Sequence, residues 1–236
     1  MAVFRFKQFT IQQERSAMKV GTDSILLGAW TAVDDEVESI LDIGAGTGIL
    51  ALMLAQRSDA THIDAVEIDS DAHIEAVTNF ENSPWADRLF CYHSSIQEFS
   101  GEMDEKYDLI ISNPPYFNPS KIQSTDSRSV ARQTHLLNHI TLLQSIKKLL
   151  KPTGTSAFII PVELEDFFLT LAGNMGLYPY RIMRVKDMES ANYKRTLLQF
   201  KFIKGQISVE TLTLKNDDTS YSDEFVTLTK DFYLNL

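Results

Sequence analysis

The residues with the clearest chemical potential in this sequence are the four that read NPPY, at positions 113–116. Pro114 and Pro115 lack an N–H and restrict the residue before each of them, so the chain must form a stiff, extended corner here. The side-chain carbonyl of Asn113 and the main-chain carbonyl of Pro114 are then two fixed acceptors for the hydrogens of a planar amino group. Tyr116 offers a flat face for an aromatic base, worth about 1–3 kcal/mol. The corner can therefore orient an amine for group transfer by positioning and preorganised electrostatics.

A second group of candidate residues lies upstream of this corner. Three glycines follow a predicted strand and precede a predicted helix: Gly44, Gly46 and Gly48. This context is the one a nucleotide-binding loop requires, since glycine lets the backbone turn tightly and approach a ligand. Glu67 ends the next predicted strand, 19 residues beyond Gly48, close to the spacing at which an acid binds ribose hydroxyls. Asp42 precedes the glycines and suits a cationic ligand group, such as an amine or a sulfonium, better than phosphates.

Asn-Pro is also a common turn signal, so an ordinary strand-to-loop turn is the competing interpretation of the corner. What favours a functional site is the order of the groups along the chain: an acid, a glycine loop, a second acid and then the corner.

The elements that must position these residues alternate between short apolar runs and longer helical patterns. Strands are predicted at residues 39–43, 63–68, 88–92, 107–112, 155–160, 180–185 and 197–202. Helices are predicted at residues 24–31, 49–56, 71–80, 134–150 and 164–174. This alternation predicts an α/β fold with a seven-stranded, mostly parallel sheet flanked by helices. Thr22 or Asp23 is the expected N-cap of the first helix. In such sheets ligands bind beyond the carboxyl ends of the strands, where the candidate residues fall.

We expect a single domain, because 236 residues are enough for one α/β core and no linker-like stretch interrupts them. The expected parts are an arm over the site, the core sheet and a C-terminal extension, at residues 1–38, 39–204 and 205–236. Residues 4–9 have the alternation of a strand-like arm, and residues 118–131 form a polar, serine-rich stretch expected to be a flap. Residues 212–214 and 225–228 are expected to pair as a terminal ribbon.

The composition excludes several other classes of protein. Apolar residues make up 44% and charged residues 23%, as in ordinary globular domains. No apolar run approaches the length of a membrane span, and no apolar signal segment follows Met1. Cys91, the only cysteine, allows no internal disulfide, fits a reducing compartment and lies in an apolar pattern expected for the core. The five scattered histidines give no metal-ligand spacing.

The net charge of −10 argues against a nucleic-acid partner at first sight, but the charges are unevenly distributed. Residues 20–111 carry 19 acidic and 3 basic residues, whereas residues 112–152 carry 1 acidic and 6 basic residues. Residues 181–204 carry 2 acidic and 7 basic residues, and residues 1–19 carry 1 and 4. A localised basic footprint is what a polyanion-binding protein needs, whatever its overall sign. The alternative is that this segregation only marks solvated surface.

Taken together, the motifs LDIGAGTG (residues 41–48), AVEID (residues 65–69) and NPPY resemble those of class I S-adenosylmethionine-dependent methyltransferases. The NPPY motif resembles that of enzymes that methylate a planar amino nitrogen, namely N6-adenine, glutamine-N5 and guanine-N2 methyltransferases. MKVGTDSILLGAW (residues 18–30) and RSVARQT (residues 128–134) further resemble the bacterial tRNA1(Val) adenine-37 N6-methyltransferase family. That resemblance runs almost from end to end of the chain.

The resemblance implies a Rossmann-like cytoplasmic enzyme that transfers a methyl group from S-adenosylmethionine to N6 of an adenine in tRNA, with adenine 37 of tRNA1(Val) as the expected target. It implies no metal, no membrane contact and no obligate protein partner. The catalytic residues expected are Asn113, Pro114, Pro115 and Tyr116. The cofactor-binding residues expected are Lys19, Thr22, Asp42, Gly44, Ala45, Gly46, Gly48, Glu67, Ile68, Asp69, Ser95, Ile96 and Asn113. The tRNA-binding residues expected are Phe117, Arg128, Arg132, Lys194 and Arg195.

Other functions stay open on the sequence. The same amine chemistry would serve a glutamine-N5 methyltransferase of a protein substrate or a guanine-N2 rRNA methyltransferase. The 38 residues before the first core strand leave little room for the extra N-terminal domain of the release-factor enzymes, and a protein substrate needs no basic footprint. A non-catalytic module that has kept the cofactor loop is a third possibility, which the intact NPPY motif disfavours.

Overall fold

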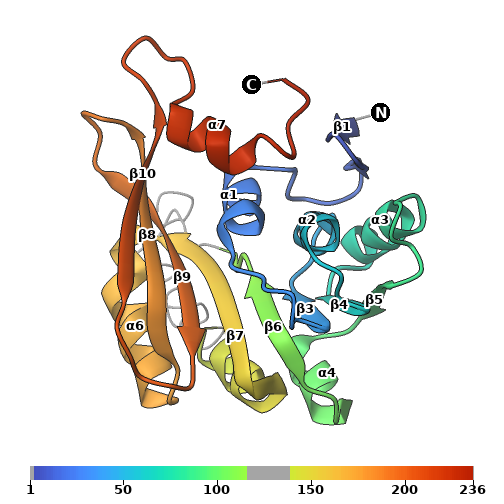
Figure 1. Ribbon diagram of the computed structural model, residues 1–236. Helices are drawn as coiled ribbons and strands as arrows, with labels where there is room; N and C mark the ends of the chain where they lie inside the picture. Colours follow the sequence, from blue (N-terminus) through green and yellow to red (C-terminus); the bar gives the residue numbers. More distant parts are fainter. Residues whose placement is uncertain (1–2, 116–138, 236) are drawn as a thin grey trace, which may run out of the picture.

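The computed structural model describes residues 3–115 and 139–235 of the chain (Figure 1). Its main strands are β3 (Ser39–Ile43), β4 (His62–Glu67), β5 (Leu89–His93), β6 (Tyr107–Ser112), β7 (Leu150–Pro161), β8 (Tyr178–Met188), β9 (Tyr193–Lys201) and β10 (Ser208–Lys215). They form one eight-stranded sheet in the order β10-β8-β9-β7-β6-β3-β4-β5. Neighbouring strands are parallel except for the pairs β7–β9 and β9–β8. The predicted α/β fold with a mostly parallel sheet is therefore confirmed.

Two apolar cores lie on the two faces of this sheet, because successive residues of a strand point to opposite sides. Along β3, Ile40 belongs to one core and Leu41 to the other. The Ile40 face is covered by α1 (Thr22–Trp30), α2 (Ile49–Arg57) and α3 (Ser70–Glu81). The Leu41 face is covered by α4 (Ile96–Glu102), a helix at residues 139–149 and α6 (Glu165–Asn174), which follows the short helix η2 (Val162–Leu164). Burial on both faces explains the continuous apolar runs in the sequence.

The parallel strands β3 to β7 all start at one edge of the sheet and end at the other. We call the edge where they end the carboxyl edge and the opposite one the amino edge; the amino edge is at the bottom of Figure 1. Helical residues 139–149 lead from the carboxyl edge back to the start of β7. All candidate groups on β3, β4 and β6 therefore meet at the carboxyl edge, as the sequence predicts.

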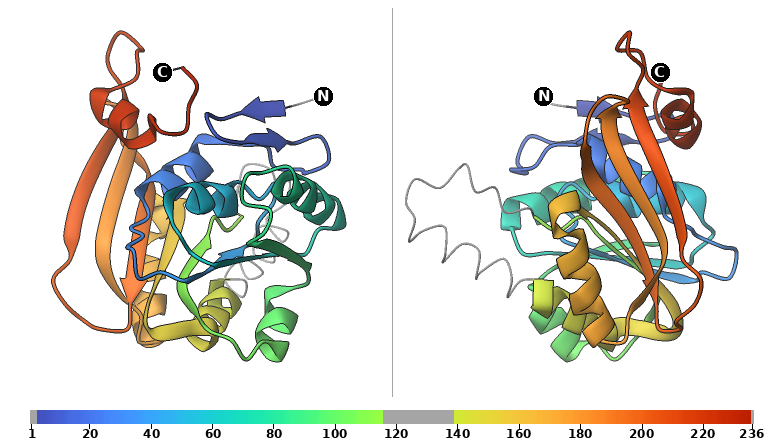
Figure 2. Two further views of the ribbon diagram at one scale, coloured as in Figure 1. Left: turned by 45° about the vertical axis from the view of Figure 1, so that its right-hand side comes forward. Right: turned by 90° about the vertical axis from the view of Figure 1, so that its left-hand side faces the viewer.

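The two ends of the chain lie side by side. β1 (Val3–Arg5) and β2 (Thr10–Gln12) form a small antiparallel ribbon, which Figure 2 shows near the segment that follows α7 (Asp223–Thr229). Phe6 bridges to Tyr233, and the Lys7 N–H donates to the Phe232 carbonyl at 2.9 Å. Residues 3–12 thus form a ribbon that is tied to the C-terminus, and the strand predicted at residues 4–9 ends at Arg5.

The C-terminal part differs from the prediction. Residues 212–214 are not half of a separate ribbon but belong to β10, which adds an eighth strand parallel to β8. Residues 225–228 are helical and lie in α7, which begins where the Ser222 hydroxyl accepts a hydrogen bond from the Phe225 N–H at 3.1 Å. Ser-Asp-Glu is a helix-start signal, and it outweighs the β-propensity of the residues that follow.

Smaller differences concern helix ends. The helix α4 was not predicted; it is fixed by a capping box in which Ser95 and Glu98 bond to each other's backbone N–H. The N-cap of α1 is Gly21 without a side-chain bond, instead of Thr22 or Asp23. Asp23 is used elsewhere, because its carboxylate binds the Arg195 guanidinium.

Candidate cofactor and active site

A cavity of about 250 Å³ opens at the carboxyl edge of the sheet. Six of the residues expected from the sequence belong to its lining or to the loops that shape it: Gly44, Ile68, Ser95, Ile96, Pro114 and Pro115. The strands β3, β4, β5 and β6 each end at this cavity, which is the position expected for a ligand in a parallel sheet. The predicted location of the site is thus matched by an actual hollow.

The glycine turn borders this cavity, and open space lies next to its backbone. Gly44, Gly46 and Gly48 all have positive φ angles, at +75°, +57° and +79°. Such angles are costly for other residues, so the local sequence dictates the turn. A Cβ atom on Gly44 or Gly46 would meet no heavy atom within 4 Å, whereas one on Gly48 would lie 2.4 Å from Phe80. Gly44 and Gly46 therefore leave open space that a ligand can use, and Gly48 is required for packing.

Glu67 ties the end of β4 to the glycine turn. Its carboxylate accepts hydrogen bonds from the Gly46 N–H at 2.7 Å and from the Asp69 N–H at 2.9 Å. Only 8% of Glu67 is exposed. Asp69 in turn caps α3 by accepting from the Ala72 N–H at 2.9 Å. The geometry leaves each Glu67 oxygen one further lone pair for a hydroxyl donor.

Asp42 is completely buried between β3 and the first turn of α2. One carboxylate oxygen, Oδ2, accepts from the Ala51 N–H at 3.2 Å, and the other, Oδ1, has no hydrogen-bond partner among the described residues. Burial raises the pKa of Asp42 to about 7, with the negative charge of Glu67 adding to the rise. A buried acceptor without a donor is costly, so this carboxylate suits a ligand that brings a donor or a positive charge.

The NPPY corner is present where the sequence predicts it, as far as the structure describes it. β6 ends at Ser112, and residues 113–115 follow without regular structure. Asn113 is half-buried, and its side-chain Nδ2 donates to the Ser24 hydroxyl at 3.1 Å. Pro114 and Pro115 both line the cavity. Tyr116, Phe117, Arg128 and Arg132, together with the expected flap at residues 118–131, lie outside the described residues.

Lys19 and Thr22 belong to the arm that passes over the glycine turn. The Lys19 ammonium donates to the main-chain carbonyls of Gln13, Glu14 and Ser16, and the Glu75 carboxylate on α3 accepts from three N–H groups of the same loop. Asn79 joins this arm to the turn, since its Nδ2 donates to the carbonyls of Gln12 and Thr47 at 3.0 and 2.9 Å. Lys19 therefore organises the loop itself, and Thr22 begins α1.

The expected tRNA-binding residues on β9 are already engaged with carboxylates. Lys194 forms an ion pair with Asp187, and Arg195 forms ion pairs with both Asp23 and Asp187. Lys194 and Asp187 also interact strongly enough to hold the pKa of Asp187 below its usual value. Arg195 therefore fastens the start of α1 to β9, and only Lys194, whose side chain is 58% exposed, projects into solvent.

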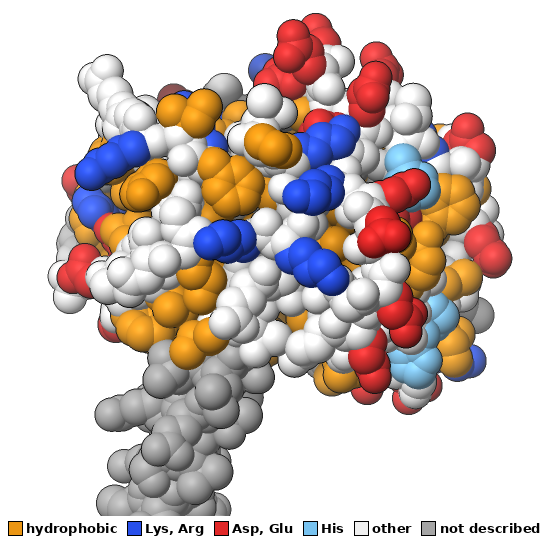
Figure 3. Space-filling model, turned by 90° about the horizontal axis from the view of Figure 1, so that it is seen from below, with side chains coloured by type: hydrophobic (Ala, Val, Ile, Leu, Met, Phe, Trp, Pro, Cys, Tyr) orange, Lys and Arg blue, Asp and Glu red, His pale blue; other side chains and the backbone are white. Residues whose placement is uncertain are grey.

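Other basic residues of the two basic segments lie at the amino edge, away from the cavity. Lys148 lies in the last turn of the helix at residues 139–149, Lys151 lies at the start of β7, Lys201 is the last residue of β9, and Lys204 follows that strand. Figure 3 views this edge from below and shows Lys and Arg side chains gathered over its middle, with Asp and Glu along one side. The two basic segments therefore do not place all of their charge near the cavity, because a strand carries its two ends to opposite edges of the sheet.

Several residues at the site were not anticipated from the sequence. Gln97, Ser112 and His139 line the cavity, and Ser24 contacts Asn113 across 89 positions. The Ser95–Glu98 capping signal could have placed Gln97 on a helix beside the cavity. No local signal identifies Ser24 or His139, since their roles depend on the packing of distant elements.

Three further observations concern metal ligands, membrane-spanning helices and the cysteine. In residues 3–115 and 139–235, no group of three or more His, Cys, Asp or Glu side chains lies together as potential metal ligands. No helix in the same part of the chain is long and apolar enough to cross a membrane. Cys91 is partly buried against the Ile40-side core, and burial raises the pKa of its thiol to about 12. That thiol is therefore a poor nucleophile at neutral pH.

Solved structures share this fold. A predicted O-methyltransferase, Atu636 from Agrobacterium tumefaciens, superposes over 91% of this chain and 100% of its own, with a TM-score of 0.72 at 16% identity. A ribosomal protein L11 methylase from Lactobacillus delbrueckii covers 75% of this chain and 77% of its own, with a TM-score of 0.55 at 18% identity. At these identities the likeness concerns the fold alone, and it confirms the predicted Rossmann-like methyltransferase architecture.

Sequence comparisons are more specific. Residues 16–155 match the methyltransferase small domain family. A tRNA1(Val) (adenine(37)-N6)-methyltransferase of Flavobacterium psychrophilum is 46% identical over 99% of this chain and 100% of its own length. The protein of the same name from Trichodesmium erythraeum is 48% identical over 98% of this chain and 97% of its own. With its glycine turn, buried acid and NPPY corner at one edge of a methyltransferase sheet, this chain belongs to the methyltransferase small domain family and, within it, to the family of tRNA1(Val) (adenine(37)-N6)-methyltransferases.

Proposed function

We propose that this protein transfers a methyl group from S-adenosylmethionine to N6 of adenine 37 in the anticodon loop of tRNA1(Val), in the cytoplasm. The names of relatives that match the whole chain support this target. The observation that carries the proposal is the position of Asn113 and Pro114 directly after β6, with Pro114 lining a cavity that the glycine turn borders.

The residues around the glycine turn fit S-adenosylmethionine, which when bound supplies a methyl group on a positively charged sulfur. Asp42 has a buried oxygen without a donor, which suits the positive end of the methionine part. Glu67 keeps a lone pair on each oxygen for ribose hydroxyls, and the open space above Gly44 and Gly46 admits a ligand. The other residues we assign to this site are Lys19, Thr22, Ala45, Gly48, Ile68, Asp69, Ser95 and Ile96, of which Lys19, Thr22, Gly48 and Asp69 act by shaping the loops.

The corner residues are proposed to orient the target amine. The Asn113 side-chain carbonyl and the Pro114 main-chain carbonyl would each accept one hydrogen of the adenine N6 group. An amine conjugated to a ring is a poor nucleophile, and holding its hydrogens out of the ring plane makes its lone pair available without a strong base. This contribution is positioning and fixed electrostatics rather than proton abstraction. Pro115 stiffens the corner.

Five residues are proposed to bind the tRNA, and of these the structure describes Lys194. We propose that Tyr116 stacks on the target base and that Phe117, Arg128, Arg132 and Lys194 contact the tRNA. Adenine 37 is unpaired in the anticodon loop, so it can be splayed into a site without breaking a base pair. Arg195 contributes indirectly, because its guanidinium already pairs with the carboxylates of Asp23 and Asp187.

A glutamine side chain in a protein is the second candidate substrate. Its amide nitrogen would fit the same corner, and the ion pairs of Lys194 and Arg195 weaken the argument that these charges exist for a polyanion. Phosphate contacts would give binding a steep salt dependence, which a protein substrate would not show.

The test is a methylation assay with labelled S-adenosylmethionine and three substrates: a tRNA1(Val) transcript, the same transcript with guanine at position 37, and a release-factor protein. We expect methyl transfer to the first substrate alone, with N6-methyladenosine found at position 37 after nuclease digestion. Transfer to the guanine-37 transcript at the same rate would refute the assignment of the nucleotide. Transfer to the release factor alone would establish the protein-substrate alternative.

A further inference from the structure

The first turn of α1 reaches the NPPY corner from a distant part of the sequence. The Ser24 hydroxyl accepts a hydrogen bond from Asn113 Nδ2 at 3.1 Å, in a partly buried position. Ser24 lies on the motif MKVGTDSILLGAW (residues 18–30), to which the proposed reaction assigns no direct contact with the amine. An asparagine amide has a donor end and an acceptor end of nearly the same shape, so its orientation is decided by its partners.

We infer that Ser24 is a positioning residue for Asn113. By accepting from Nδ2, it anchors the nitrogen end of the amide and restricts rotation of the side chain, which helps to fix where the carbonyl oxygen lies. Without this bond the carbonyl oxygen is held less precisely, so it binds a hydrogen of the substrate amine less effectively. The inference rests on the proposed function, because it concerns the same amine-binding corner.

The position of Ser24 is itself firmly held. Its neighbour Asp23 is ion-paired with Arg195, and Arg195 also binds Asp187 at 3.1 Å, so the first turn of α1 is fastened to β9 and β8. Further along α1, a Cβ atom on Gly28 would lie 2.7 Å from the Met53 sulfur, which shows how closely α1 packs on α2. A hydroxyl on a helix that is held in two places keeps a fixed position, and such an anchor is what positioning the Asn113 side chain requires.

Replacing Ser24 tests this role. Ser24→Thr and Ser24→Val have nearly the same shape and differ in the hydroxyl, so their comparison isolates the hydrogen bond from packing. We expect Ser24→Thr to keep most of the wild-type single-turnover rate and Ser24→Val to lose about tenfold, the factor that one hydrogen bond is worth. Affinity for S-adenosylhomocysteine, measured by calorimetry, should change less than about twofold in both.

A matched control is Ser58→Ala, because the Ser58 hydroxyl donates to the Leu54 carbonyl at 2.8 Å at the end of α2, near the amino edge. That variant loses a comparable hydroxyl bond and should keep the wild-type rate. Equal rates for Ser24→Thr and Ser24→Val would overturn the inference, as would a loss of rate in Ser24→Val that Ser58→Ala shares.

A double-mutant cycle separates this inference from the proposed mechanism. If Ser24 acts through Asn113, Ser24→Val should slow the wild-type enzyme but should not slow Asn113→Ala any further. If Ser24→Val slows the wild-type enzyme and Asn113→Ala by the same factor, Ser24 acts independently of Asn113. The inference would then be wrong while the mechanism stands. A fully active Asn113→Ala enzyme would instead remove the amine-binding mechanism itself.

Discussion

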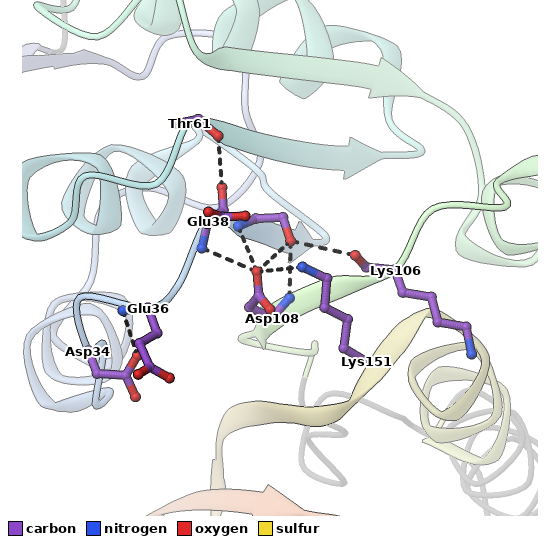
Figure 4. Close-up of polar contacts among 8 residues, drawn as sticks. Asp34, Glu36, Glu38, Thr61, Lys106, Asp108 and Lys151 are labelled. Carbon is purple, nitrogen blue, oxygen red and sulfur yellow. Dashed lines mark hydrogen bonds and ion pairs between the residues drawn. The ribbon is translucent and has the colours of Figure 1, made fainter.

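Two aspartates on neighbouring strands show how differently the two edges of this sheet use a carboxylate. Asp42 lies near the carboxyl edge on β3 and Asp108 near the amino edge on β6, and these strands pair in parallel. Asp108 accepts from the N–H groups of Glu38 and Ser39, from the Ser39 hydroxyl and from Lys151, at 3.2, 3.0, 2.9 and 2.8 Å (Figure 4). Asp42 has one donor for its two oxygens.

The pKa values of these two carboxyls move in opposite directions. Burial acts to raise the pKa of Asp108, but the hydrogen bonds from Lys151 and Ser39 outweigh it and hold that pKa below its usual value. Burial raises the pKa of Asp42 to about 7, and the single bond from Ala51 only partly opposes it. A carboxylate that several donors hold, as at Asp108, stabilises the fold, and one with a buried oxygen that lacks a donor is available to a ligand. From this comparison we propose that the amino edge serves stability and the carboxyl edge serves binding.

The largest effect at the carboxyl edge is expected for Asn113→Ala. Removing one preorganised hydrogen-bonding group from such a site costs about 10²–10³ in rate. The melting temperature should change little, because Asn113 lies past the end of β6. Single-turnover methylation and thermal unfolding measured together test this pair of expectations.

Asn113→Asp sharpens the same test. It keeps an acceptor in nearly the same place, so more activity should remain than with alanine. If Asn113 only caps the turn before two prolines, alanine would lower the melting temperature and leave the rate per folded molecule near that of the wild type. That result would give Asn113 a structural role, like that of Asp108 at the amino edge.

At the amino edge, Asp108→Asn should lower the free energy of unfolding by about 1–3 kcal/mol, because it disturbs several hydrogen bonds and an ion pair. Cofactor affinity should stay unchanged. Since the folded-state pKa of Asp108 is depressed, its contribution is present above the ordinary carboxyl pKa and is lost as the pH falls through the folded value. Urea unfolding at pH 7 and at pH 3 should therefore show a difference between wild type and variant that shrinks in acid.

Replacing Asp42 should have the opposite pattern of effects, with a loss of cofactor affinity and no loss of stability. Asp42→Ala should weaken S-adenosylmethionine binding at least tenfold, about 1.4 kcal/mol. Asp42→Asn should leave the stability of the ligand-free protein equal or higher, because it removes a buried negative charge that has one hydrogen-bond donor among the described residues. Calorimetry of the folded variants provides the test, and unchanged affinity would remove Asp42 from the cofactor site.

The raised pKa of Asp42 also predicts a pH dependence. Its neutral form favours the ligand-free fold, so that contribution is present below the ordinary carboxyl pKa and is lost as the pH rises through about 7. A cationic ligand prefers the ionised form, so affinity for S-adenosylmethionine should increase between pH 6 and pH 8. Asp42→Asn should flatten this increase, and a slope equal to that of the wild type would assign the titration to another group.

Sequence reasoning predicted most of the carboxyl edge because its signals are local. Glycines that need positive φ and prolines that end a strand specify their own backbone, and their order along parallel strands brings them to one edge. It failed where the outcome depends on distant partners. The ion pair of Arg195 with Asp23, across 172 positions, was not anticipated. β10 was missed as a sheet strand because its pairing with β8 leaves no mark in its own sequence.

The smallest expected effects concern lysines at the two edges. Lys194 is exposed near the carboxyl edge, where the cavity opens, and Lys204 lies at the amino edge that Figure 3 shows. Lys194→Glu should weaken tRNA binding by less than tenfold, because Asp187 already offsets part of its charge. Loss of one phosphate contact should reduce the slope of log affinity against log salt by about 0.7–0.9.

Lys204→Glu makes the same charge change at the other edge and serves as the matched control. Lys204 lies over the Tyr178 ring, 5.9 Å from its centroid, and has no carboxylate partner among the described residues. If the tRNA is held only at the carboxyl edge, this reversal should leave both the affinity and the salt slope at their wild-type values. Lys204→Glu could instead weaken binding as much as Lys194→Glu does. The tRNA stem must then extend along the helix at residues 139–149 to the lysines of the amino edge. At 1.5 Å per residue this path is roughly 15 Å long. The amino edge would then serve recognition as well as stability, and the division of labour between the two edges would fail.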